Sequence, residues 1–268
     1  MPEEASITST PSLRHGVFIA TSAMRWSVNP LPELQALCRT VEAAGFDFVS
    51  FPQHLSIPPD HVAALGRNWR DPIALCATAL ASTTRLKVVS TVVVAPVYPL
   101  VLLQHKVSTL AWLGGGRFEL GLGAGYLRAD FSSDEHFTAR FRLLRHAVHA
   151  VHEAEPDLPL WIGGRGVASA ALARRVGATW VPSEAPRDLV EAEIRQNTQT
   201  VPISGWFDPE SACEDISRWR LAGASGVLLR LNARSPKALG IAAEAVAAGL
   251  YPARDGAPLP VLSRPERG

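Results

Sequence analysis

The sequence has few cysteines, and their arrangement excludes two kinds of stabilising site. Among 268 residues there are three, Cys38, Cys76 and Cys213, widely separated and with no C-x-x-C pair. An odd number at such spacings predicts neither a disulfide framework nor a cysteine metal site. Cys38 and Cys76 lie in apolar helical patterns, where we expect them to be small buried side chains.

An excess of one charge and a long hydrophobic run are also missing. Lysine and arginine number 26 and acidic residues 25, a formal net charge of +1, whereas nucleic-acid binders usually concentrate basic residues. The most apolar stretch, 88–96, contains Ser90 and Thr91 and is too short to span a bilayer. The N-terminal residues lack the apolar segment of a signal peptide. We therefore expect a soluble, cytoplasmic protein without a nucleic-acid or membrane partner.

Several catalytic motifs are absent as well. The chain has no P-loop and no G-x-S-x-G nucleophile turn. His146, His149 and His152 recur every third residue along one expected helix. That spacing drifts around the helix and brings no carboxylate with it, so we predict no metal site there.

What the chain does have is a regular alternation of short β-rich runs and longer helical patterns. We expect strands at 17–20, 46–51, 86–95, 117–122, 160–162, 179–181, 201–206 and 226–231. Helical patterns cover 32–44, the segment beginning with Asp71 and Pro72, 99–113, 138–153, 167–176, 184–196, 209–221 with Asp208 as its cap, and 236–248.

Eight such βα units predict an α/β fold with a parallel sheet. Eight is the number that closes a (β/α)8 TIM barrel, and a doubly wound open sheet is the alternative. We expect one barrel domain at 15–251, with disordered tails at 1–14 and 252–268. In a barrel, the residues that directly follow each strand form the catalytic face.

Glycines follow the fourth expected strand. Gly121, Gly123 and Gly125 precede Tyr126, so the run is not the dinucleotide fingerprint G-x-G-x-x-G. Glycine lets the backbone approach a ligand closely, which predicts a cofactor-binding turn. The alternative is a tight βα turn with a purely structural role.

A second glycine-rich turn follows the fifth expected strand. Gly163, Gly164, Arg165 and Gly166 lead into an alanine-rich helix. The unpaired N–H groups at a helix start bind phosphate, and an arginine adds a charge-assisted contact. The alternative for Arg165 is a solvated loop side chain.

Two further strand ends carry candidate residues. Gln53 and His54 follow the second strand, where a histidine is able to donate to a bound heterocycle or protonate it, although a structural histidine is the alternative. Ser90 and Thr91 interrupt the apolar third strand before Val92. That interruption predicts a local kink that places backbone against a flat ligand.

Residues 71–131 resemble the luciferase-like monooxygenase superfamily, in particular its oxidoreductases that depend on the deazaflavin coenzyme F420. The resemblance rests on D-P-I-A-L from Asp71, R-L-K from Arg85, P-L-V-L from Pro99 and, most specifically, G-G-R-F-E-L-G-L-G-A-G-Y ending at Tyr126. Weaker matches extend it from about Val17 to Leu231.

This resemblance implies a bacterial luciferase-like barrel, commonly a homodimer, that holds F420 or FMN at its C-terminal mouth. It implies a non-prolyl cis peptide at Thr91–Val92 behind the tricyclic ring, and places the ribityl phosphate region at the two glycine turns. It also places His54 near the ring.

The chain departs from the family pattern in three places. Gln53 stands where relatives commonly carry aspartate, and Tyr126 where many carry tryptophan. Between Phe141 and Pro159 there is one helix, where relatives usually insert a long segment that helps to cover the active site. We expect the shorter chain either to leave the substrate side more open or to have another segment that covers it.

These observations support three functional hypotheses. The first is hydride transfer between F420 and a small organic substrate, with His54 managing a proton and Gln53 and Tyr126 orienting the substrate. The second is an FMN-dependent monooxygenase that uses O2. The third is a catalytically degenerate barrel with a binding role, which the missing segment favours and the intact glycine turns disfavour.

Overall fold

The computed structural model describes residues 13–196, 199–207, 209–231 and 233–250. Residues 1–12 of the expected N-terminal tail and all of the expected C-terminal tail, 252–268, lie outside these ranges. Residue 251 and the expected cap Asp208 also lie outside them. Leu13 is buried and Arg14 begins the first strand, so the prediction of a tail reaching residue 14 is wrong at its last two residues.

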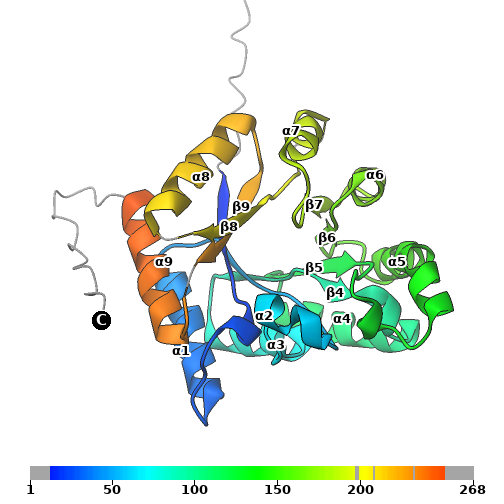
Figure 1. The fold of residues 1–268 in the computed structure, drawn as a ribbon, viewed down its shortest axis with the longest axis horizontal. Helices are drawn as coiled ribbons and strands as arrows, with labels where there is room; N and C mark the ends of the chain where they lie inside the picture. Colours follow the sequence, from blue (N-terminus) through cyan, green and yellow to red (C-terminus); the bar gives the residue numbers. More distant parts are fainter. Residues whose placement is uncertain (1–12, 197–198, 208, 232, 251–268) are drawn as a thin grey trace, which may run out of the picture.

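The predicted alternation of strands and helices is confirmed (Figure 1). The strands are β1 (Arg14–Phe18), β2 (Phe48–Phe51), β3 (Lys87–Ser90), β4 (Val93–Val94), β5 (Phe118–Gly123), β6 (Leu160–Gly163), β7 (Thr179–Val181), β8 (Ile203–Phe207) and β9 (Gly226–Leu231). The helices are α1 (Pro30–Ala43), α2 (Val62–Leu65), α3 (Pro72–Ser82), α4 (Leu100–Gly114), α5 (Asp134–Ala154), α6 (Val167–Arg175), α7 (Arg187–Gln196), α8 (Pro209–Ala222) and α9 (Pro236–Leu250).

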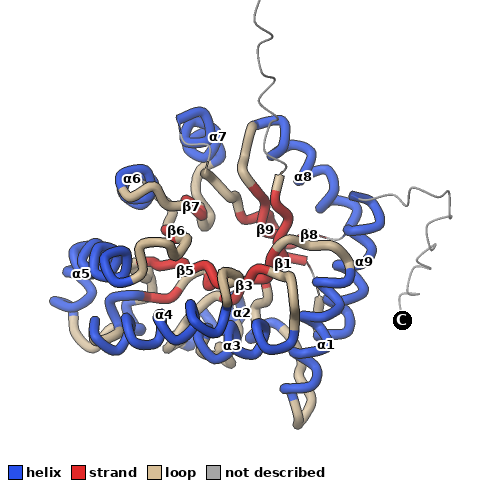
Figure 2. Tube along the Cα trace, turned by 180° about the vertical axis from the view of Figure 1, so that it is seen from behind, coloured by secondary structure: helices blue, strands red, loops and turns tan. Residues whose placement is uncertain are grey.

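The strands form a curled parallel sheet with the helices outside it, the barrel architecture rather than the open sheet (Figure 2). Their order is β7-β6-β5-β3-β2-β1-β9-β8, with β4 paired to β5. The two ends of this order meet at one parallel bridge between Trp180 and Thr200. There the backbone N–H of Trp180 donates to the Gln199 carbonyl at 2.8 Å, and the backbone N–H of Val201 donates to the Trp180 carbonyl at 2.9 Å. The barrel is therefore incompletely closed between β7 and β8.

The third expected strand is divided in the structure. Val89 pairs with Glu119, but Val93 pairs with Leu122, so four steps along β3 and β4 match three steps along β5. One residue is thus extra, as in a β-bulge. The Thr91–Val92 peptide within this segment is cis, which confirms the expectation from the family resemblance. β3 and β4 follow one another beside β5, so together they count as one strand of the barrel, and the nine strands fill eight positions.

Local features of the chain explain where three of the helices begin. Asp71 accepts hydrogen bonds from the backbone N–H groups of Ile73 (2.7 Å) and Ala74 (3.2 Å), so α3 begins where the sequence predicts. Helix α5 begins at Asp134, four residues before the expected start, because Ser133 caps its first turn. Helix α7 starts three residues later than expected, after Glu184, whose φ of 52° is not helical.

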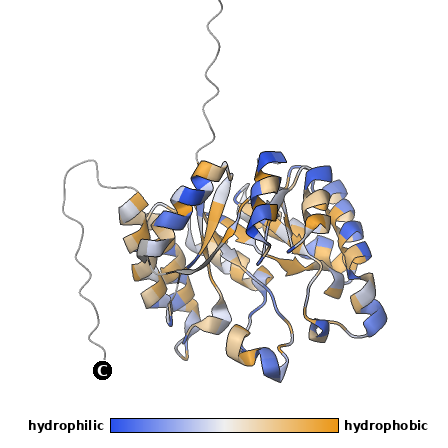
Figure 3. Cartoon of the chain, turned by 45° about the horizontal axis from the view of Figure 1, so that its top comes forward, coloured by the Kyte–Doolittle hydropathy of each residue, from blue (hydrophilic) through white to orange (hydrophobic). Residues whose placement is uncertain are grey.

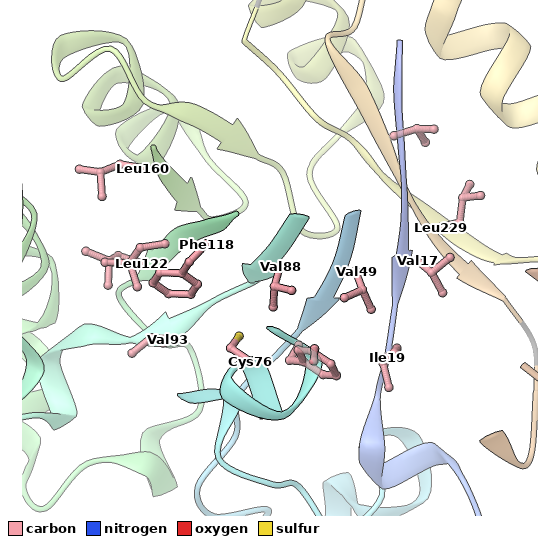
Figure 4. Close-up of a cluster of buried hydrophobic side chains, with 14 of the residues drawn as sticks. Val17, Ile19, Val49, Cys76, Val88, Val93, Phe118, Leu122, Leu160 and Leu229 are labelled. Atoms are coloured by element: carbon pink, nitrogen blue, oxygen red, sulfur yellow. The ribbon is translucent and has the colours of Figure 1, made fainter. Parts of the chain in front are cut away.

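Apolar side chains fill two separate regions. The larger lies between the strands and the surrounding helices and includes Val17, Val49, Val88 and Leu229, all fully buried (Figure 4). Figure 3 shows the hydrophobic colour along the strands of the sheet. Cys38 and Cys76 lie in this region and are buried, as predicted. The smaller fills the barrel interior, with members Phe48, Val89, Trp161, Val181, Val201 and Leu228.

No helix in the described ranges has both the length and the apolarity needed to cross a bilayer.

Candidate active site

Charged and aromatic side chains pack against one another at the amino-terminal end of the barrel. Arg14 forms a bidentate ion pair with Glu119, at 2.9 and 3.2 Å. The indole of Trp161 donates to the same carboxylate at 2.8 Å, and Arg14 stacks over Phe48 at 5.0 Å. A candidate site therefore lies at the opposite end, where the strands lead into their longer loops.

At that end, three glycines of β5 and β6 make room for the bulged strand. A Cβ atom on Gly123 would lie 2.4 Å from Val92 Cγ2, and one on Gly163 would lie 2.5 Å from Val92 Cγ1. A Cβ atom on Gly121 would lie 1.9 Å from the Ser90 carbonyl oxygen. These glycines thus have a packing role that the sequence analysis did not consider. Cofactor contact by Gly121, Gly123 and Gly163 stays a prediction.

The three residues of the predicted kink differ in exposure. Ser90 is fully buried and exchanges hydrogen bonds with the backbone of Gly121, at 2.9 and 3.0 Å. Thr91 is also buried and donates to the Ser50 hydroxyl at 2.8 Å. Val92 is partly exposed, so it is the member of this group with side-chain surface left for a ligand.

His54 lies in an aromatic pocket after β2. Its ring packs edge-to-face against Trp69 (4.6 Å between centroids) and Tyr126 (5.5 Å). Its Nδ1 atom is 3.8 Å from Asp130 Oδ2, and these side chains are 12% and 1% exposed. Neither of these two atoms has a hydrogen-bond partner. Asp130 is held by the backbone N–H groups of residues 55 and 56, which donate to Oδ1 at 3.0 and 2.8 Å.

The Gln53 side chain is buried and uses both ends of its amide group. It donates to the Tyr98 hydroxyl at 2.6 Å and accepts from the backbone N–H of Val94 at 2.8 Å. Tyr98 in turn donates to Asp71 at 3.3 Å. Burial raises the pKa of Tyr98 to about 12; the Gln53 hydrogen bond lowers it and Asp71 raises it further. These contacts tie β4 to the start of α3, and direct contact between Gln53 and a substrate stays a prediction.

Tyr126 is 55% exposed at the edge of the same pocket. Partial burial raises its pKa, the charges of Glu184 and Asp130 raise it further, and Arg165 opposes them. Tyr126 is therefore electrostatically coupled to residues from three different loops.

The second glycine turn leads from β6 into the start of α6. Gly164 has φ 155°, and a Cβ atom there would lie 2.6 Å from the Ser169 hydroxyl, so the turn requires glycine. Gly166 is the N-cap residue of α6, and Arg165 beside it is exposed. Gly125, after β5, has φ 75° and packs against Val94 and Phe131.

The sequence analysis missed Asp130, whose position in a loop that follows a strand was the available signal but which belongs to no motif. Trp69 was expected either to line a pocket or to lie in the core, and the structure places it against His54. His146, His149 and His152 lie on the exposed side of α5, away from this pocket. In the described residues, no three histidine, cysteine, aspartate or glutamate side chains are grouped to hold a metal.

Fold and site together define a parallel α/β barrel with a histidine–aspartate pair, a bulged strand and a glycine turn before α6 at its mouth. The sequence profile of the family described as luciferase-like monooxygenase matches residues 12–155, which is more than half of the chain. The chain belongs to this family, as the sequence resemblance predicts. A search of curated proteins finds no match.

Solved structures share the fold. The monooxygenase RslO1 from Streptomyces bottropensis superposes with a TM-score of 0.75 at 16% identity, covering 90% of this chain and 99% of that one. An F420-dependent secondary alcohol dehydrogenase in complex with an F420–acetone adduct gives 0.65 at 14%, covering 87% and 99%. The oxygenating constituent of 3,6-diketocamphane monooxygenase from Pseudomonas putida, in complex with FMN, gives 0.72 at 11%, covering 90% and 99%.

Proposed function

We propose that this protein is an F420-dependent oxidoreductase that transfers hydride between the deazaflavin and a small organic substrate. The observation that carries the proposal is the buried pair of unpartnered polar atoms, His54 Nδ1 and Asp130 Oδ2, in an aromatic pocket at the barrel mouth. Buried polar atoms without partners are rare and call for an explanation, and a site completed by a ligand is one.

The surrounding residues fit such a cofactor. Val92 offers partly exposed apolar surface beside the glycines of β5 and β6, suited to one face of a flat ring. The backbone N–H of Gly164 already donates to the Val181 carbonyl at 3.3 Å, so Gly166 and the first turn of α6 are where a phosphate group would bind next to Arg165. When bound, F420 would supply the hydride chemistry at its C5 atom, and the protein would supply position and proton control.

His54 is the residue that would move a proton. Nδ1 faces Asp130, which favours the tautomer that carries the proton on Nδ1 and leaves Nε2 to exchange a proton with the substrate. The 3.8 Å separation is longer than a hydrogen bond, and such contacts commonly shorten when a ligand binds. Asp130 acts through His54 and is a positioning residue. Trp69 and Tyr126 hold the imidazole ring from two sides.

The test is an absorbance titration of the purified protein with F420 and, separately, with FMN. We expect F420 to bind in the micromolar range, and His54→Ala to weaken binding about three- to tenfold, the value of one hydrogen bond. His61→Ala is the matched control, since His61 is a more exposed histidine of the same loop. Binding of FMN alone would replace the proposal with an FMN-dependent monooxygenase. Binding of neither cofactor would refute it and favour a barrel without redox activity. A homodimer and a cytoplasmic location stay predictions.

A further inference from the structure

A groove on the outer side of the barrel begins at the helix start that the proposed cofactor phosphate would use. It lies between the neighbouring helices α5 and α6 and has a volume of about 350 Å³ (Figure 1). Its α6 side includes Ala168 and Ser169, in the first turn after the N-cap residue Gly166. The groove and the proposed phosphate position therefore share one helical turn. Its other lining residues are Phe141, Leu144, Arg145, Ala171, Leu172 and Arg175.

The direction of the two helices sets the order of residues along this α5–α6 groove. Each helix follows a strand of the parallel sheet, so both run from the mouth toward the opposite end of the barrel. On α5, Phe141 precedes Arg145 by one turn, and on α6, Ala168 precedes Arg175 by two turns, roughly 10 Å of helix. The groove therefore has exposed apolar side chains nearer the mouth and cationic side chains farther along.

The two arginines of the groove have no counter-charge. Arg145 and Arg175 are exposed, and neither makes a hydrogen bond or ion pair with another residue that the structure describes. Of the described residues that line the groove, none is acidic. The neighbouring Arg174 differs, because it pairs with Glu193. A guanidinium keeps its charge at neutral pH, so the groove is a cationic surface available to an anion.

We propose that the α5–α6 groove binds the anionic tail of F420, with Arg145 and Arg175 contacting its carboxylates. Beyond the phosphate, F420 continues into a lactyl group and a chain of γ-linked glutamates, whereas FMN ends at the phosphate. Guanidinium groups bind carboxylates through paired, charge-assisted hydrogen bonds. The exposed side chains of Phe141 and Ala171 suit the methylene groups of the same chain. The inference rests on the proposed function and makes this groove a determinant of the choice of F420 over FMN.

The test compares F420 without glutamates and F420 with several glutamates, each titrated into the protein and followed by cofactor fluorescence. Both forms carry the ring and the phosphate, so the difference between their Kd values reports the glutamates alone. We expect the form with glutamates to bind about three- to tenfold more tightly at low salt, the range for two solvent-exposed ion pairs. The difference should shrink in about 0.5 M salt, because dissolved ions screen exposed charges.

Substitutions then assign the preference to the groove. Arg145→Gln and Arg175→Gln should each reduce it, and the double variant should abolish it without weakening binding of the form that lacks glutamates. Arg145→Lys should retain part of the preference, because it keeps the charge and loses the paired hydrogen bonds. Arg195→Gln is the matched control, since Arg195 is an exposed arginine of another groove, between α7 and α8. It should leave the preference unchanged.

The outcomes separate this inference from the proposed function. Equal affinity for the two forms of F420, or a preference that survives the double variant, would overturn the inference and leave the proposed function intact. An equal loss in Arg195→Gln would also overturn it, because the preference would then report overall charge. Should the double variant fail to fold, a preference that salt does not reduce overturns the inference in the wild-type protein. Binding of neither form would overturn the proposed function and this inference together.

Discussion

The three glycines around the bulged strand give a prediction with a distinct pattern of rescue. Substitution by alanine places a Cβ atom against backbone at Gly121 but against the Val92 side chain at Gly123 and Gly163. A side chain is removable by a second substitution, and a backbone carbonyl is not. We therefore expect Val92→Ala to rescue Gly123→Ala and Gly163→Ala but not Gly121→Ala.

The magnitudes follow from the distances. Overpacking of a core costs about 1–3 kcal/mol. Gly121→Ala, whose Cβ would lie 1.9 Å from a carbonyl oxygen, should cost about 3 kcal/mol or more, because the strand must move. Gly123→Ala and Gly163→Ala, at 2.4 and 2.5 Å from methyl groups, should cost about 1–2 kcal/mol each. In a protein of this size, 3 kcal/mol lowers Tm by roughly 6–12 °C.

The assay is urea denaturation of single and double variants, analysed as a double-mutant cycle. We expect a coupling of about 1 kcal/mol or more between Val92 and each of Gly123 and Gly163. Gly166→Ala is the control, since nothing lies within 4 Å of its Cβ position; as the N-cap of α6 it should cost about 0.5–1 kcal/mol, the preference of a helix start for glycine over alanine, and Val92→Ala should not rescue it. Equal stability of Gly121→Ala and wild type, or its full rescue by Val92→Ala, would refute this packing account.

Two further predictions concern buried charged groups. Glu119→Leu leaves the one-third exposed Arg14 without its bidentate partner and Trp161 without its acceptor, so it should cost about 2–3 kcal/mol in urea denaturation. Recovery in Arg14→Met/Glu119→Leu is expected, and an unaffected single variant would contradict this. Burial lowers the pKa of His15, Asp47 opposes this and Arg220 adds to it. Its folded pKa thus lies below its unfolded value, so its contribution to stability is complete above about pH 6.5 and declines as the pH falls below that, by at most about 1.4 kcal/mol per unit. Unfolding free energies at pH 5–7.5 should show a shallower acid slope in His15→Gln; an unchanged slope would contradict the account.

The sequence predicts the order of βα units because strand and helix periodicities depend on neighbouring residues. It also predicts the start of α3, where Asp71 and Pro72 form a local cap. Boundaries were missed where the signal was one capping side chain, as at Ser133. The incomplete closure between β7 and β8 depends on how distant segments pack, and no local pattern reports it.

The candidate site was predicted in part. His54 and the glycine turns stand directly after strands, and strand ends meet at one face of a barrel. Asp130 lies 76 positions from His54 in sequence, and only folding brings their side chains within 3.8 Å. The packing role of the glycines was also hidden, because it requires the one-residue bulge that displaces Val92.

The most direct test of the central claim is a crystal structure of the protein with F420. The account predicts the deazaflavin ring against Val92 and within contact of His54, with the phosphate at Gly166 and the first turn of α6. It also predicts a distance between His54 Nδ1 and Asp130 Oδ2 shorter than 3.8 Å. A cofactor bound outside the barrel mouth, or a phosphate away from the α6 start, would contradict it.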